Sequence, residues 1–185
     1  PDTLWIAAQE MITNKHVDQW MHGLESRSYV TRDTIGYSHE GRPVSLLRIG
    51  ESDDQRMIMV LSRQHPPEVP GFLAMQAFIE TLSGDSPQAR AFRESYVVFN
   101  VPLMNPDGVD NGHWRHNLGG IDLNRDWWEF NQPETRAVRD FLNEKRGAGY
   151  QLVFGAAYQD VEGAFLPLLD ALDQLLVQVS LAHPG

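Results

Sequence analysis

Apolar and polar positions alternate along this chain in two periodicities. Short apolar runs bounded by turn residues are typical of strands, and apolar positions recurring every three to four residues are typical of amphipathic helices. The pattern predicts strands over residues 29–35, 44–49, 57–61, 96–103 and 150–154. It predicts helices over residues 13–26, 69–82, 133–146 and 165–181.

Because strands alternate with helices, we expect an α/β fold with a mixed, largely parallel central sheet flanked by helices. The apolar runs at 57–61, 96–103 and 150–154 suit strands buried on both faces. The long segment 105–128 has no clean periodicity and is rich in Gly, Asn and Asp. Loops of that length inside compact domains are usually functional.

The composition excludes some classes of partner. The formal net charge is -10 with a pI near 5.0, and recognition of nucleic acid or of an anionic membrane needs basic patches instead. No apolar run approaches the ~20 residues of a membrane span, so we expect a soluble protein, cytoplasmic or periplasmic. The chain has no cysteine, so a metal ion would be held by His, Asp or Glu.

The strongest local signal is an imidazole and a carboxylate three residues apart, His65 and Glu68, directly after a predicted buried strand. Both are suitable zinc ligands, and a loop allows them to bend back on one cation. Ligands also bind at strand ends in open α/β sheets. The alternative is that these are ordinary loop residues and that Pro66 and Pro67 only set a turn.

A second signal lies in the long loop, where Arg115 and Arg125 are ten residues apart. A guanidinium group can bind a carboxylate through two parallel hydrogen bonds, and it can stabilise an oxyanion. Beside a metal, the two arginines would suit a site that recognises a peptide carboxylate. The alternative is that both arginines pair with nearby aspartates at the surface.

Taken together, the motifs resemble the zinc carboxypeptidases of the funnelin type, and more the bacterial and cytosolic branches than the digestive enzymes. The resemblance covers roughly residues 30–158. It rests on four ordered motifs: His65-Pro-Pro-Glu68, Asn105-Pro-Asp-Gly108, Trp114-Arg115 and Leu123-Asn124-Arg125.

The resemblance implies a zinc-dependent metallocarboxypeptidase that cleaves the C-terminal amide bond of peptides or cell-wall peptides with a free terminal carboxylate. His65 and Glu68 would be two of three ligands to one Zn²⁺ per chain. Arg115 would stabilise the oxyanion, and Asn124 and Arg125 would bind the terminal carboxylate. The nucleophile would be a zinc-activated water, assisted by a general-base glutamate.

The chain departs from the family pattern at the third zinc ligand, a histidine that follows the strand at 152–154. No histidine stands there, and Glu162, the only glutamate after Tyr150, lacks the surroundings of the family's general base. His113 and His116, which flank Arg115, are more typical of hydrogen-bonding or solvent-facing residues. We expect residues 1–185 to form one catalytic domain, incomplete at its C-terminus and near residues 155–157, and leave the third ligand and the base unassigned.

Two other functions stay open. A non-catalytic relative would bind peptide C-termini through Asn124 and Arg125 without cleaving them. Amidase or deacylase chemistry on the same scaffold is the third option, because a fold does not determine its substrate. The preferred C-terminal residue, any segment upstream of Pro1 and the oligomeric state are not set by these residues.

Overall fold

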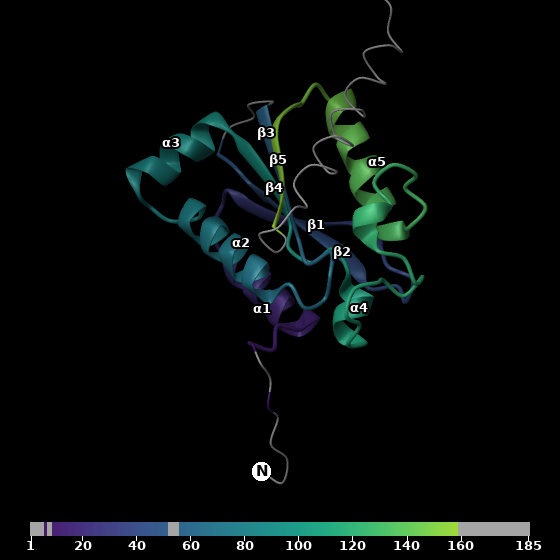
Figure 1. Cartoon of the computed structure of the whole chain (residues 1–185). Coiled ribbons are helices and arrows are strands. Elements are labelled where there is room, and N and C mark those ends of the chain that lie inside the picture. Colours follow the sequence, from purple (N-terminus) through teal and green to yellow (C-terminus); the bar gives the residue numbers. More distant parts are fainter. Residues whose placement is uncertain (1–5, 7–8, 52–55, 159–185) are drawn as a thin grey trace, which may run out of the picture.

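The computed structural model describes Ile6, residues 9–51 and residues 56–158. A five-stranded sheet in the order β1-β2-β4-β3-β5 forms its centre, with helices on both faces (Figure 1). The strands are β1 Val30–Tyr37, β2 Pro43–Ile49, β3 Arg56–Ser62, β4 Val97–Val101 and β5 Gln151–Tyr158. The helices are α1 Asn14–Leu24, α2 Val69–Leu82, α3 Pro87–Ser95, α4 Pro106–Asp110 and α5 Pro133–Gly147, with a 3-10 turn at Leu123–Arg125.

The sheet is mixed and flanked by helices, as the sequence predicts. β3 is parallel to both β4 and β5, whereas β2 is antiparallel to β1 and to β4. Parallel strands have their carboxyl ends at the same edge of a sheet. The loops that follow β3 and β4 therefore leave from one edge, and Tyr158 at the end of β5 pairs with Ser62 at the end of β3.

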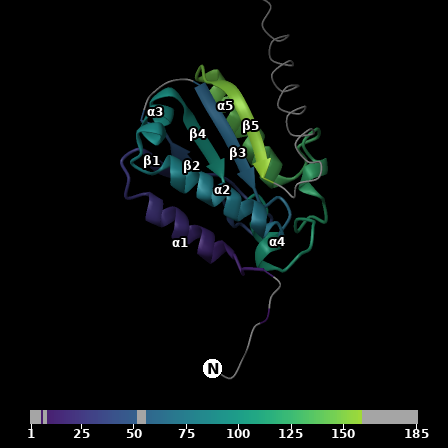
Figure 2. The same cartoon turned by 60° about the vertical axis from the view of Figure 1, so that its left-hand side comes forward.

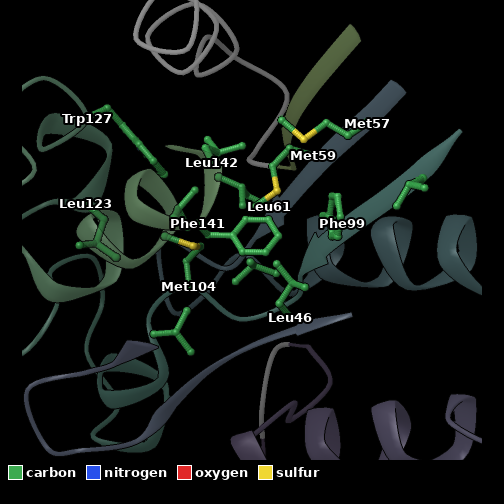
Figure 3. Close-up of a cluster of buried hydrophobic side chains, with 14 residues drawn as sticks. Leu46, Met57, Met59, Leu61, Phe99, Met104, Leu123, Trp127, Phe141 and Leu142 are labelled. Atoms are coloured by element: carbon green, nitrogen blue, oxygen red, sulfur yellow. The ribbon is translucent and has the colours of Figure 1, made fainter. Parts of the chain in front are cut away.

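Each face of the sheet is buried under its own helices. Helices α1, α2 and α3 lie on one side and α5 lies on the other (Figures 1 and 2). Alternate residues of β3 contribute to the two cores: Ile58 and Val60 pack with α1 and α2, while Met57, Met59 and Leu61 pack with α5. Figure 3 shows the second cluster, in which Phe141 and Leu142 lie among strand side chains. This alternation explains why β3 has no polar face.

Several predicted elements need correction in detail. Helix α2 has the predicted bounds, but α3 was not predicted, because its sequence is mostly polar. The predicted loop at 105–128 contains α4 and the 3-10 turn. Strand β5 continues four residues past the predicted end at Phe154. The helix predicted over 165–181 lies outside the described residues.

No helix within the described ranges is both long and apolar enough to cross a bilayer.

Candidate metal centre

The loop that joins β3 to α2 carries the predicted metal ligands. It begins after Ser62 and ends at Glu68, the N-cap residue of α2. The Glu68 amide donates to the carbonyl of His65 at 3.2 Å, which closes a tight turn around Pro66 and Pro67. The positive end of the α2 dipole also favours an anionic side chain at Glu68. The turn therefore places the imidazole and the carboxylate on the same side of the loop.

His65 and Glu68 contact each other directly and are both 5% exposed. Nδ1 of His65 is hydrogen bonded to Oε1 of Glu68, and the His65 amide donates to Oε2 at 3.3 Å. Nε2 of His65 lies 2.8 Å from Oδ1 of Asp122. Burial alone would lower the pKa of His65, but the hydrogen bonds to the two carboxylates raise it above its ordinary value. The structure thus brings together the two predicted ligands.

Asp122 connects this pair to the long loop, a role the sequence did not reveal. Its Oδ2 accepts from Nε of Arg115 at 2.8 Å and lies 3.9 Å from Nε of Arg125. Burial alone would raise the pKa of Asp122, but hydrogen bonds from His65, Arg115 and the Asn124 amide lower it. The available signal was a carboxylate placed between two arginines, but the contact with His65 spans 57 residues.

The three residues predicted to face substrate have different surroundings. The side chain of Arg115 is 45% exposed and pairs with Asp122, so the predicted surface pairing is present, but its partner also holds His65. Asn124 is buried, and its Oδ1 has no hydrogen-bond partner. The side chain of Arg125 is 70% exposed. Their substrate roles stay predictions.

The long loop (residues 105–128) is hydrogen bonded to the metal loop (residues 63–68) at Gln64, the residue before His65. The indole Nε1 of Trp127 donates to Oε1 of Gln64 at 2.7 Å, and Nδ2 of Asn105 donates to the Gln64 carbonyl at 3.1 Å. Trp127 is 1% exposed and packs in the core, whereas Trp128 is exposed. A Cβ on Gly108 would lie 2.6 Å from Oδ1 of Asn105, so only glycine fits there.

A buried carboxylate, Asp107, anchors the same loop to the β1–β2 turn. It accepts hydrogen bonds from Ser38 Oγ at 2.7 Å, the Glu40 amide at 3.0 Å and Arg42 Nη1 at 2.7 Å. Burial alone would raise its pKa, but these three donors lower it. The anchor holds the first part of the loop against the sheet.

A second buried carboxylate, Glu134, lies at the start of α5. Its Oε2 accepts from Nδ2 of Asn117 at 3.0 Å, while its Oε1 has no partner. Burial raises the pKa of Glu134 above its ordinary value.

Asp126 accepts hydrogen bonds from the amides of Asn131 and Gln132, and these contacts fix the chain between the 3-10 turn and α5.

The donor set supplies part of a zinc site. His65 and Glu68 face each other, and a carboxylate on the far nitrogen of His65 is the arrangement that orients metal-bound imidazoles. Among the residues that the structure describes, no group of three His, Asp or Glu side chains is placed to hold a metal ion. His113, which flanks Arg115, uses its Nδ1 in a hydrogen bond to the His116 carbonyl. The residues present therefore fit two of the ligands of a zinc ion.

Open α/β sheets bind their ligands at the carboxyl ends of the strands, and the imidazole, carboxylate and guanidinium groups found there suit metal-assisted hydrolysis. The sequence comparison gives the family. The chain belongs to the zinc carboxypeptidase family, whose model matches residues 17–162.

Cytosolic carboxypeptidases match this chain over part of their own length. Cytosolic carboxypeptidase 6 of Caenorhabditis elegans is 32% identical over 154 residues, covering 78% of this chain and 34% of the relative. Cytosolic carboxypeptidase 6 of Homo sapiens is 35% identical over 124 residues, covering 62% of this chain and 24% of the relative. This chain therefore spans at most about a third of these two relatives.

Solved structures of bacterial enzymes share the fold. A metallo-carboxypeptidase from Pseudomonas aeruginosa, in complex with (2-guanidinoethylmercapto)succinic acid, is 29% identical with a TM-score of 0.68. The match covers 77% of this chain and 38% of that chain. A metallo-carboxypeptidase from Burkholderia cenocepacia is 28% identical with a TM-score of 0.68, covering 72% of this chain and 38% of that one.

Proposed function

We propose that this chain carries the zinc-binding and carboxylate-binding part of a metallocarboxypeptidase that hydrolyses the C-terminal amide bond of peptides, including cell-wall peptides. The supporting observation is the buried contact between His65 and Glu68, with Asp122 behind the imidazole and Arg115 on the same carboxylate. This arrangement concentrates ligand and guanidinium groups at one edge of the sheet.

In this proposal His65 and Glu68 hold one Zn²⁺ per chain. Asp122 accepts a hydrogen bond from the Nε2–H group of His65, which would leave Nδ1 as the ligand atom. The ion supplies a Lewis acid for the scissile carbonyl and for water. A third ligand must reach the same edge, and the end of β5 is close to it, because Tyr158 pairs with Ser62.

The remaining groups bind and orient the peptide. Arg115 stabilises the negative charge that develops on the carbonyl oxygen. Asn124 and Arg125 bind the terminal carboxylate, for which the Nδ2 group of Asn124 and the exposed guanidinium of Arg125 are the hydrogen-bond donors. Recognition of a free carboxylate would restrict cleavage to chain ends. We assign the general base to no described residue.

The test is release of C-terminal residues by zinc-loaded protein from a peptide library, with C-terminally amidated peptides as a second substrate set. We expect release only from free carboxylates, and loss of release in Glu68→Gln and after chelation. Glu144→Gln, an exposed carboxylate paired with Lys145, is the matched control.

The alternatives give different results. Binding of free-carboxylate peptides without release would indicate the non-catalytic relative. Cleavage of the amidated peptides alone would indicate an amidase or deacylase. Either outcome would overturn the carboxypeptidase proposal.

A further inference from the structure

Arg63 is a buried cation at the start of the metal loop. It follows β3 directly, is 2% exposed, and lies two residues before His65. Burial lowers its pKa to about 10, and the nearby charge of Glu68 offsets part of that effect. Burial of an arginine is unfavourable unless its donors are paired. Its presence here therefore calls for a specific contact.

The guanidinium makes that contact with the turn that carries the ligands. Nη2 donates to the Pro66 carbonyl at 2.6 Å and to the Ile12 carbonyl at 3.2 Å. Nε and Nη1 have no hydrogen-bond partner, and the group lies 5.9 Å from the centre of the Phe72 ring. Most of the donors of this buried cation are thus unused, and its shorter bond goes to Pro66, which lies between the two proposed ligands.

The two prolines limit how many hydrogen bonds the turn can form. Pro66 and Pro67 have no amide hydrogen, so neither can donate to the backbone. Gln9 donates to the Pro67 carbonyl at 2.8 Å from the segment before α1. Arg63 and Gln9 therefore hold the two proline carbonyls.

The backbone of Arg63 is also unusual. Its φ is 54°, in the left-handed region that favours glycine. The Met104 amide donates to the Ser62 carbonyl at 3.0 Å and the Asn105 amide donates to the Arg63 carbonyl at 3.1 Å, so the segment that follows β4 fixes this conformation. Glycine would make the same bend without strain, but it would lack the guanidinium.

We propose that Arg63 is a positioning residue of the metal loop, whose guanidinium holds the Pro66 carbonyl so that His65 and Glu68 converge. This inference rests on the proposed function, because it takes His65 and Glu68 as the metal ligands. In this role Arg63 acts through its bond to the Pro66 carbonyl and not as a ligand. The same Nη2 group also donates to the Ile12 carbonyl, so Arg63 links the segment just before α1 to this turn.

The first measurement needs no metal. The amides of His65, Glu68 and Val69 bond to Glu68 Oε2, the His65 carbonyl and the Pro67 carbonyl, so their hydrogen exchange reports whether the turn is closed. In metal-free Arg63→Met and Arg63→Gly, we expect their exchange to quicken at least about 10-fold relative to the amides of β3 and β4. The methionine variant keeps the bulk, and the glycine variant relieves the backbone.

Zinc affinity is the second measurement, by competition with a chromophoric chelator. We expect both variants to bind zinc about 10–100-fold more weakly, the usual effect of removing a group that orients a ligand. The matched control is Arg93→Met, because Arg93 is 1% exposed and donates to the Gly84 carbonyl at 2.8 Å, outside the metal loop. This control should lower overall stability but change neither the relative exchange of the three amides nor the zinc affinity.

The outcomes separate the two proposals. If the three amides stay protected in both Arg63 variants, Arg63 is not a positioning residue, whatever the zinc result. If the amides open in these variants and the unmodified chain binds no zinc, the positioning contact stands as a property of the turn and the metal function fails.

Discussion

Nε2 of His65 lies 2.8 Å from Oδ1 of Asp122, although the two residues are 57 positions apart. The bond fixes the ring plane of the imidazole and leaves Nδ1 directed at Glu68. The same carboxylate holds Arg115 at 2.8 Å. One side chain thus sets the geometry of a proposed ligand and of a proposed catalytic arginine.

Asp122→Asn should weaken zinc binding about 10–100-fold, because the amide is a poorer acceptor for the imidazole proton and no longer pairs with Arg115. Chelator competition measures the change. Asp140→Asn is the control, since Asp140 is exposed and pairs only with its neighbour Arg139 among the described residues. An Asp122→Asn affinity within about twofold of the unmodified protein would contradict this role.

Zinc should stabilise the folded protein and not the His65→Ala variant. A ligand that binds only the folded state at about 100 times its Kd adds about 2.7 kcal/mol to the free energy of unfolding. Urea denaturation with and without zinc measures this gain. His22→Ala, which removes an exposed histidine of α1, should keep the full gain. Equal gains in both variants would show that zinc binds elsewhere.

Asp107→Asn should lower the free energy of unfolding by about 1–3 kcal/mol at pH 7, because the new amide group places a donor against the Glu40 amide and loses the charge facing Arg42. The pKa of Asp107 is lowered on folding, so its stabilisation is full above its ordinary pKa of 3.8 and is lost as the pH falls through the folded value. The difference between the two proteins, measured in urea, should therefore shrink in acid. A difference independent of pH would argue against the charge.

Glu134 should show the opposite dependence on pH. Its pKa is raised on folding, so its contribution is full below the ordinary value of 4.5 and is lost as the pH rises through the folded value. Glu134→Gln should match the unmodified protein in acid and be the more stable of the two at pH 7. Urea denaturation at both pH values measures this, with Glu144→Gln as an exposed control on the same helix. Greater stability of the unmodified protein at pH 7 would show that the charged form is the favoured one.

The sequence predicted the elements whose pattern is set locally. The apolar run before His65 and the stripe of α2 gave β3 and α2 nearly to the residue. Helix α3 was missed because only Ala89 and Arg93 of its residues are buried, which leaves no apolar face to recognise. The end of β5 was misplaced because Gly155 and two alanines lack strand propensity, while pairing with β3 keeps them extended.

The candidate site was predicted in its residues but not in its connections. His65 and Glu68 are three residues apart, so their meeting follows from a turn. Asp122 and Arg63 were not identified, because their contacts depend on the positions of segments far apart in the chain. Composition and residue spacing do not predict contacts between such distant segments.

The bond between Trp127 and Gln64 has a mechanical consequence. Trp127 belongs to the loop with Asn124 and Arg125, and Gln64 immediately precedes His65. One hydrogen bond therefore links these two parts of the proposed site. Removing that bond, as in Trp127→Phe, would loosen the position of Asn124 and Arg125 relative to His65. The spacing of the two proposed halves of the site would then depend on this buried indole, which belongs to neither half.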